Sequence, residues 1–249
     1  MDENNRINKF LSEYNKSVIQ AFTERVKPLS DAAKAISVNI PKFPKIEFPK
    51  IEIAYERIES IIEHNSSYGW TMTGEMNTLV YMDGRLIELN GEQIDSIFVN
   101  YYGEYSKENY YITKDILLGE INDQWKEVLT DCFDLYEEGK YKVIIPMLIS
   151  IVESEVSFIT QSDAYGRGLL NEWGSKILNE KQKLTLIISR SIHNYLKDSL
   201  FGFKNFNSDR GSYLNRNWVL HGRDDPNLWK KSDALKLINL LSSLQFIKD

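Results

Sequence analysis

The sequence predicts an all-α protein, and three observations support that fold class. Apolar residues recur at steps of three and four positions over most of the chain, which is the period of helices that bury one face. Glycine and proline stand where several of these periodic segments end or begin. The hydrophobic share of 42% and the aromatic share of 12% are typical of a chain that folds around a core. At 249 residues, the chain has room for one large domain or two small ones.

The first part of the chain divides into helices and a proline-containing linker. Residues 1–38 show the helical period, with an interruption at Pro28, and we expect N-terminal helices there. Residues 39–53 contain three Pro-Lys pairs, each of which leads into an apolar residue. Spaced prolines exclude a helix and favour an extended segment. This segment is either a linker whose apolar side chains lie along the folded body or a docking strand for a partner protein.

Residues 54–114 form a middle region that we expect to be mainly helical. The helical period is present over residues 54–64 and again over residues 94–102. Between them, residues 79–89 hold two short apolar runs separated by Asp83-Gly84, a turn pair that β-hairpins prefer. A small β-hairpin and a pair of short helices both fit this segment, and the helical surroundings favour the helices.

Five tyrosines cluster at the end of this middle region. Interleaved with Lys107 and Lys114, they could stack on exposed bases of a nucleic acid. Glu104 and Glu108 lie in the same stretch, however, and favour a role in the core or at an interface instead. The tyrosines are Tyr101, Tyr102, Tyr105, Tyr110 and Tyr111.

Residues 115–249 carry the strongest helical signal. The segment at residues 141–160 is apolar on nearly all sides, which predicts that it is the central helix of a bundle. Within it, Glu153 and Glu155 stand among apolar residues, and a buried carboxylate is costly unless it is paired. Residues 163–172 are expected to be a connection. The expected helices cover residues 116–138, 141–160 and 181–200 and the segment after Ser232.

An arginine, an amide and a histidine lie close together in residues 213–222, which we expect to form a helix that ends at Gly222. At about 100° per residue, Asn217 and His221 lie one turn apart on the same face, and Arg216 lies beside Asn217. A guanidinium stays charged and binds phosphate oxygens in pairs, while an imidazole transfers protons near neutral pH. The three side chains together suit a phosphodiester.

The run Arg216-Asn217-Trp218-Val219-Leu220-His221 resembles the signature of HEPN domains, in which an arginine and a polar residue precede a histidine by a few positions. HEPN proteins are small α-helical bundles, and many are metal-independent ribonucleases of toxin–antitoxin, abortive-infection and CRISPR systems. The resemblance covers residues 115–249. It implies a HEPN-like bundle that forms a homodimer, in which Arg216, Asn217 and His221 of both protomers converge on one composite cleft.

The resemblance also implies a reaction and a supporting residue. The 2′-hydroxyl of RNA would attack the neighbouring phosphate and leave a 2′,3′-cyclic phosphate and a 5′-hydroxyl, with no cofactor. HEPN-like proteins often carry an acidic residue on the helix equivalent to residues 141–160, and Glu153 is the candidate here. It would hold Arg216 by a bidentate salt bridge or orient Arg216 or His221 within the site. The expected role is a toxin or antiphage effector, with RNA as substrate and an antitoxin or regulatory protein as a further partner.

Two less specific interpretations remain open. In the first, Arg216 pairs with Glu153 for stability alone, Asn217 caps a neighbouring turn and His221 is a residue at a helix end. In the second, the fold is a catalytically silent HEPN-like module that mediates dimerisation or regulates a partner. The sequence does not separate them, because the same Arg216–Glu153 contact serves every interpretation.

Further basic residues could contact phosphates. Lys204 and Arg210 lie on the loop before the motif, and Arg223 follows it. Arg190 and His193 are three positions apart on the preceding helix, where they either add to a phosphate-binding patch or lie on a solvent-exposed face.

Composition and motifs exclude several classes of protein. The net charge of −6 weighs against broad affinity for nucleic acid but permits a small local cleft. Cys132 is the only cysteine, so an intrachain disulfide and a cysteine metal site are excluded and a reducing, cytoplasmic location is expected. Three separated histidines do not predict a metal site, and the motifs of nucleotide-binding, esterase and zinc-protease sites are missing from the sequence.

No targeting or membrane segment is expected. The first six residues are charged and polar, unlike a signal peptide. The most apolar run, Val143–Val152, is shorter than the ~20 residues that a membrane helix needs.

Overall fold

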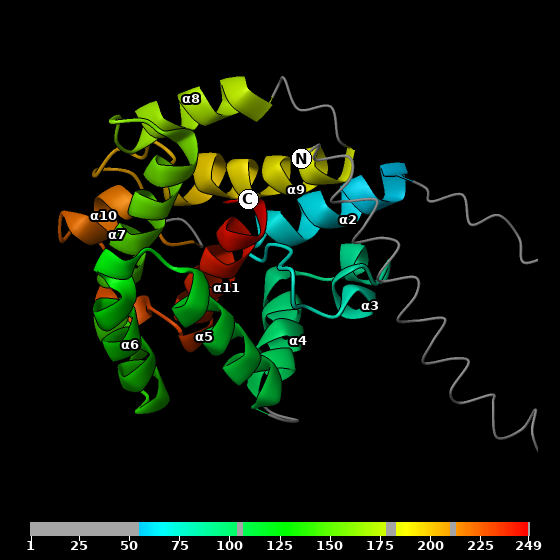
Figure 1. The fold of residues 1–249 in the computed structure, drawn as a ribbon, viewed down its shortest axis with the longest axis horizontal. Helices are drawn as coiled ribbons and strands as arrows, with labels where there is room; N and C mark the ends of the chain where they lie inside the picture. The colour runs from blue at the N-terminus through cyan, green and yellow to red at the C-terminus, as the bar shows by residue number, and fades with distance from the viewer. Residues whose placement is uncertain (1–54, 104–106, 178–182, 210–212, 249) are drawn as a thin grey trace, which may run out of the picture. The chain divides into compact units, whose positions relative to one another are not determined.

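The computed structural model describes residues 55–103, 107–177, 183–209 and 213–248, and all regular secondary structure in these residues is helical, as the sequence predicts. The α-helices are α2 (Tyr55–Ser67), α3 (Thr78–Tyr81), α4 (Gly91–Gly103), α5 (Glu108–Glu120), α6 (Asp123–Glu137), α7 (Tyr141–Thr160), α8 (Arg167–Ile177), α9 (Lys183–Tyr195), α10 (Arg216–Leu220) and α11 (Lys231–Lys248) (Figure 1). Short 3-10 turns cover Leu86–Glu88 and Pro226–Leu228, and one turn of π-helix covers Leu196–Leu200.

Residues Ala54–Asp249 form one compact unit. The boundary that we expected between residues 54–114 and 115–249 falls inside α5, and helices from both sides of it pack against α11. The helices expected in residues 1–38 and the linker expected in residues 39–53 lie outside the described residues.

The last helix, α11, occupies the centre of this unit. It packs against α4, α5, α7 and α9, and Figure 1 shows it running between them. The predicted central helix, α7, packs against α6, α8, α10 and α11, but it leaves Val143 66% exposed and Phe158 55% exposed on its outer side. Nearly all residues of α11 from Ser232 to Gln245 are buried.

Polar side chains on α11 are buried because each finds a partner. The side-chain oxygen of Asn239 accepts hydrogen bonds from the backbone N–H of Thr71 at 2.8 Å and from the Thr71 hydroxyl at 3.0 Å. The side-chain amide nitrogen of Asn239 donates to the Tyr102 hydroxyl at 3.1 Å. The ammonium of Lys236 pairs with Asp95 at 2.6 Å. Since buried polar groups are stable only when they are hydrogen-bonded, these contacts allow a helix without a clear apolar stripe to form the core.

The helix expected over residues 116–138 is broken into α5 and α6. Ile121 adopts an extended backbone, with φ −65° and ψ 148°, and Asn122 precedes the first turn of α6. Ile121 is nevertheless only 5% exposed, so the apolar pattern continues across a change of direction in the backbone. Periodicity alone therefore predicts the buried side chains correctly and misses the break.

The structure decides between the two alternatives for residues 79–89 and differs from the expectation for residues 163–172. Residues 79–89 contain α3, a turn at Asp83-Gly84 and a 3-10 turn, so the helical alternative is confirmed over the β-hairpin. Residues 163–172 were expected to be a connection, but α8 begins at Arg167, directly after Gly166 in a left-handed conformation with φ +53°.

Within the described residues, α7 alone is long and apolar enough to cross a membrane. Half of its apolar stretch is buried within the protein. The helix has the bounds that the sequence predicts, but its apolar stretch extends beyond the run Val143–Val152, and its buried residues continue from Ile144 to Thr160.

Candidate functional site

The Arg-Asn-His motif lies on α10, a helix of only five residues that Asn215 caps. The Asn215 side-chain oxygen accepts hydrogen bonds from the backbone N–H groups of Asn217 at 3.2 Å and Trp218 at 3.3 Å. Its amide nitrogen donates to the carbonyls of Ser199 at 3.2 Å and Gly202 at 2.7 Å. One side chain therefore begins the helix and fixes it to the end of the preceding helical segment.

The motif helix ends where the sequence predicts, although it begins later. Gly222 has φ +63°, a left-handed conformation that favours glycine, and its N–H donates to the Val219 carbonyl at 3.1 Å. Trp218 and Val219 are buried and hold α10 against the body. Because these two residues face inward, Arg216, Asn217 and His221 remain on the outer side, half-buried or exposed.

Arg216 and Glu153 form a bidentate salt bridge, which is one of the two roles expected for Glu153. Arg216 Nε donates to Glu153 Oε2 at 3.0 Å, and Nη2 donates to Oε1 and Oε2 at 3.1 and 2.9 Å. Glu153 Oε1 also accepts from the backbone N–H of Gly166 at 2.8 Å. The Arg216 side chain is 19% exposed and the Glu153 side chain is 17% exposed, so both are mostly buried but still reach solvent. Paired bonds to a carboxylate fix the plane of the guanidinium.

Asn217 continues this chain of contacts. Its side-chain oxygen accepts a hydrogen bond from Arg216 Nη1 at 3.0 Å. The Asn217 amide nitrogen makes no hydrogen bond within the described residues, and neither does the imidazole of His221. The backbone N–H of His221 donates to the Asn217 carbonyl at 3.1 Å, which places these residues one turn apart as expected.

His221 is exposed and lies next to an aromatic residue and a cation. Its ring meets Phe206 edge-on, with 6.0 Å between ring centroids and an interplanar angle of 75°. The guanidinium of Arg223 lies over the same Phe206 ring at 5.6 Å. Proton-transfer capacity, positive charge and an aromatic surface therefore meet at the solvent-exposed end of α10.

The other predicted phosphate contacts are divided between the motif and other faces. The Lys204 carbonyl accepts a hydrogen bond from Trp218 Nε1 at 3.4 Å, so this loop residue lies against α10. Arg210 lies outside the described residues. Arg190 pairs with Glu59 on α2 at 3.4 Å, and His193 bonds to the Leu170 carbonyl on α8 at 3.1 Å. Neither Arg190 nor His193 contacts the motif.

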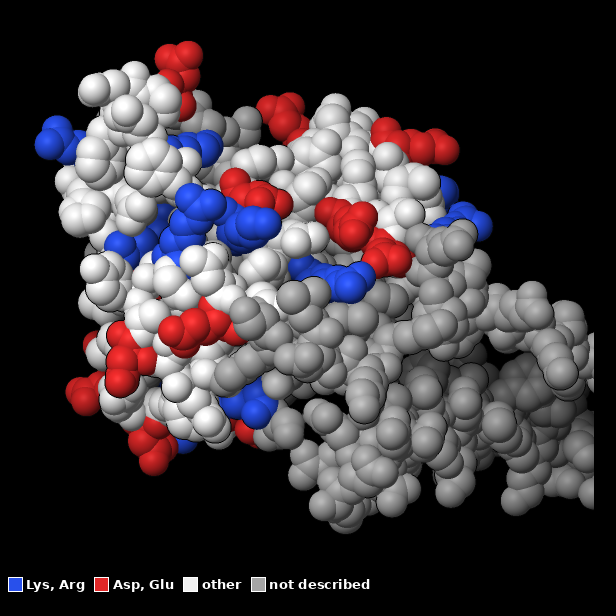
Figure 2. Space-filling model, turned by 90° about the horizontal axis from the view of Figure 1, so that it is seen from above, with Lys and Arg blue, Asp and Glu red and all other residues white. Residues whose placement is uncertain are grey.

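The surface around these elements carries mixed charge. Figure 2 shows Lys and Arg side chains gathered on the side of the molecule where α10 lies in Figure 1, with acidic side chains between and below them.

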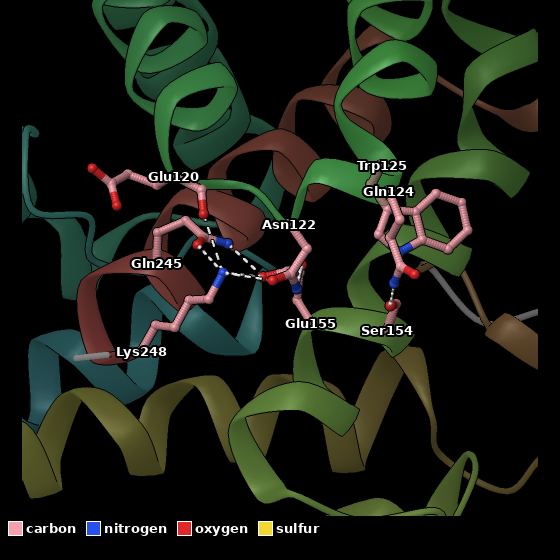
Figure 3. A network of polar contacts seen from close by, with 8 residues as sticks. All are labelled: Glu120, Asn122, Gln124, Trp125, Ser154, Glu155, Gln245 and Lys248. Carbon is pink, nitrogen blue, oxygen red and sulfur yellow. Dashed lines mark hydrogen bonds and ion pairs between the residues drawn. The ribbon is translucent and has the colours of Figure 1, made fainter.

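Glu155 lies on the opposite side of α7 from Glu153, two residues and about 200° away. Its carboxylate is fully buried and accepts hydrogen bonds from Asn122 at 2.5 Å and Gln245 at 2.9 Å, and the Lys248 ammonium pairs with it at 3.2 Å. Figure 3 shows these groups converging from the α5–α6 turn and the end of α11. These contacts pair and hydrogen-bond a buried carboxylate, which is what its burial requires.

Two residues of the site were not anticipated from the sequence. Asn215 directly precedes the motif and is of the residue type that caps helices, so it could have been found. Phe206 lies in an irregular loop of residues 201–209, where no periodic signal indicates which side chains approach α10.

No family model, curated protein or solved structure matches the chain. In the part of the chain that the structure describes, no group of three or more His, Cys, Asp and Glu side chains has the arrangement of metal ligands.

Proposed function

We propose that this protein is a HEPN-type endoribonuclease that cleaves RNA without a metal ion, and that it acts in the cytoplasm as a toxin or abortive-infection effector. The single observation that carries the proposal is the contact chain Glu153–Arg216–Asn217, which ends one helical turn from an exposed His221 with an unbonded imidazole. This arrangement provides a fixed cation and a free proton-transfer group at the surface, which are the two groups that RNA cleavage by its own 2′-hydroxyl requires.

In the proposed reaction, His221 accepts the proton of the 2′-hydroxyl as its oxygen attacks phosphorus. The bond from phosphorus to the 5′-oxygen breaks, and that oxygen takes up a proton, so the products are a 2′,3′-cyclic phosphate and a 5′-hydroxyl. Arg216 stabilises the extra negative charge on the phosphate oxygens, and Glu153 keeps its guanidinium in position. Asn217 offers its unbonded amide N–H groups to the same phosphate.

The proposal includes a homodimer. A single protomer supplies one His221, whereas the reaction needs one group that accepts a proton and one that donates a proton. If α10 of two protomers met, the partner's His221 would supply the second group. The exposed position of His221 and Phe206 at the edge of the molecule is compatible with such a pairing.

The first prediction tests the site directly. We expect His221→Gln to reduce single-turnover cleavage of total RNA in EDTA about 10²–10⁴-fold, because proton transfer is lost. We expect Arg216→Lys to reduce it about 10²–10³-fold, because a point charge does not replace the planar fork. His64→Gln and Arg85→Ala are matched controls on other faces and should keep full activity. If both motif variants cleaved RNA as fast as the wild-type protein, the motif would not be the catalytic site.

A second candidate function has one observation in its favour. Arg216 already gives Nε and Nη2 to Glu153, as it would in a purely structural pair. In a catalytically silent dimerisation or regulatory module, Arg216→Lys would lower the free energy of unfolding. The wild-type protein itself would not cleave RNA. Sedimentation of the wild-type protein, combined with the cleavage assay, separates the two: a stable dimer without cleavage of any RNA favours the silent module.

A further inference from the structure

A cavity lies between α4, α5, α6 and the first turn of α11, and none of the motif residues lines it. Its volume is about 230 Å³. We call it the tyrosine pocket, because four of its lining residues are Tyr102, Tyr110, Tyr111 and Tyr136. The volume is below the roughly 300–1,000 Å³ of sites for drug-sized ligands, so it suits a ligand of one or two fused rings.

The walls of the tyrosine pocket are aromatic. Tyr110 and Tyr136 stack on each other with 5.4 Å between ring centroids and an interplanar angle of 25°. Tyr111 meets Tyr110 edge-on at 5.4 Å and is 42% exposed, so its ring is available to a ligand. Val99 and Leu235 add apolar surface. Flat rings gain stacking energy against such walls, whereas non-planar groups of equal size do not.

Among the described residues that line the tyrosine pocket, the unpaired charges are positive. Lys107 and Lys231 both line it, are exposed and form no ion pair with a described residue. The Lys231 ammonium lies 5.4 Å from the centre of the Tyr136 ring. The acid of the pocket, Glu137, is already neutralised, because it pairs with Lys114 at 2.6 Å and accepts a hydrogen bond from the Tyr110 hydroxyl at 3.3 Å. Two cations therefore remain for a ligand.

One more group can recognise a ligand. The Tyr136 hydroxyl makes no hydrogen bond within the described residues, although the residue is 7% exposed. A phenol in this position donates a hydrogen bond to a carboxylate or another anionic oxygen. The site thus combines an apolar aromatic body with a hydrogen-bond donor and two cations at one end.

We propose that the tyrosine pocket binds a small planar aromatic anion, of which an aromatic carboxylate is the simplest form. The ring lies against Tyr111, Val99 and Leu235, and the carboxylate faces Lys107, Lys231 and the Tyr136 hydroxyl. The proposal is independent of the ribonuclease assignment, since it uses none of the motif residues.

Isothermal titration calorimetry of the full chain with 2-naphthoate tests this. We expect saturable binding with one site per protomer, and binding at least tenfold weaker for the neutral 2-naphthamide and for the non-aromatic cyclohexanecarboxylate. Absence of binding at millimolar 2-naphthoate, or equal affinity for the amide, would overturn the proposal.

Variants locate the site. Lys231→Gln and Tyr111→Leu should each weaken 2-naphthoate binding about tenfold or more. Lys230→Gln is the matched control, because Lys230 is the preceding residue, is exposed and does not line the tyrosine pocket. Circular dichroism and thermal unfolding should be the same for all three variants. Equal weakening by Lys230→Gln, or none by Lys231→Gln in a folded protein, would place the anion elsewhere and refute the assignment.

Discussion

Arg216 is held by its neighbours on one edge and remains available on the other. A guanidinium has five N–H donors. Glu153 occupies the edge formed by Nε and Nη2, and Asn217 takes one hydrogen of Nη1. The second hydrogen of Nη1 is left for a ligand. A side chain that is fixed by a bidentate pair loses little further freedom when it binds a phosphate, which is the condition for efficient electrostatic stabilisation.

At the residue scale, Asn215 is the strongest test of how α10 is fixed. Asn215→Ala removes a helix cap, which contributes about 0.5–2 kcal/mol, and two side-chain hydrogen bonds to carbonyls, which contribute about 1 kcal/mol each. We expect the free energy of unfolding in urea to fall by about 2.5–4 kcal/mol, and RNA cleavage to fall with it at temperatures where the protein is still folded.

Asn227→Ala serves as the control for this substitution. Asn227 is exposed, and only its backbone is hydrogen-bonded. Its replacement should change the free energy of unfolding by less than about 0.5 kcal/mol. Similar effects at the two positions would show that the Asn215 side chain does not anchor the motif helix.

At the scale of the helices, α7 shows what the sequence could predict and what it could not. Its apolar period and two carboxylates indicated both the helix and the need for partners, and the contact between Glu153 and Arg216 is present. The partners of Glu155 come from residue 122 and from the end of α11, and pairing over such distances leaves no local signal. The apolar period of a sequence therefore predicts which residues are buried. It does not predict which helix lies at the centre, because that depends on contacts between distant parts of the chain.

The other differences between the predicted and the observed helices also arise where local sequence patterns carry no information on tertiary contacts. The break at Ile121 is invisible to periodicity, because the side chain is buried whether or not the helix continues. The first turns of α8 follow Gly166, and glycine in a sequence signals a turn without showing how soon the next helix begins. The sequence predicts a helix after Ser232 but not its burial on all sides, because the partners of its serines and of Asn239 come from distant parts of the chain.

The Glu155–Lys248 pair gives a prediction at this scale. Glu155→Met leaves Lys248 and two amides without their shared partner and should lower the free energy of unfolding by about 3–5 kcal/mol. The double variant Glu155→Met/Lys248→Met should lower it by less than the sum of the two single variants, because the second substitution removes a cation that the first left unpaired. Urea unfolding of the four proteins in the cycle measures this coupling.

The exposed pair Lys140–Glu138 is the matched control, since each side chain is 58% exposed. Removing either partner should change the free energy of unfolding by no more than about 1 kcal/mol. Strict additivity in the Glu155 and Lys248 cycle would mean that the two charges do not interact in solution.

At the scale of the whole molecule, the core is unusually rich in buried phenols. Burial raises the pKa of each of these tyrosines above its ordinary value, and for Tyr110 the neighbouring carboxylate of Glu137 raises it further. They lie on five different helices, namely α3, α4, α5, α6 and α9. The tyrosines are Tyr81, Tyr102, Tyr110, Tyr136 and Tyr195.

These raised pKa values predict how the protein unfolds in alkali. A tyrosine whose pKa is higher in the folded than in the unfolded state contributes stability that is fully present below the unfolded value of about 10 and is lost as the pH rises above it. The five buried phenols should therefore ionise together with unfolding, and the near-ultraviolet absorbance of tyrosinate should rise in the same transition in which the helical circular dichroism is lost. Tyr195→Phe removes one of the protons released, so it should make the free energy of unfolding fall less steeply with pH above about 10. If every tyrosine ionised near pH 10 while the helical signal stayed constant, these phenols would be open to solvent and the packing around α11 would differ from that described.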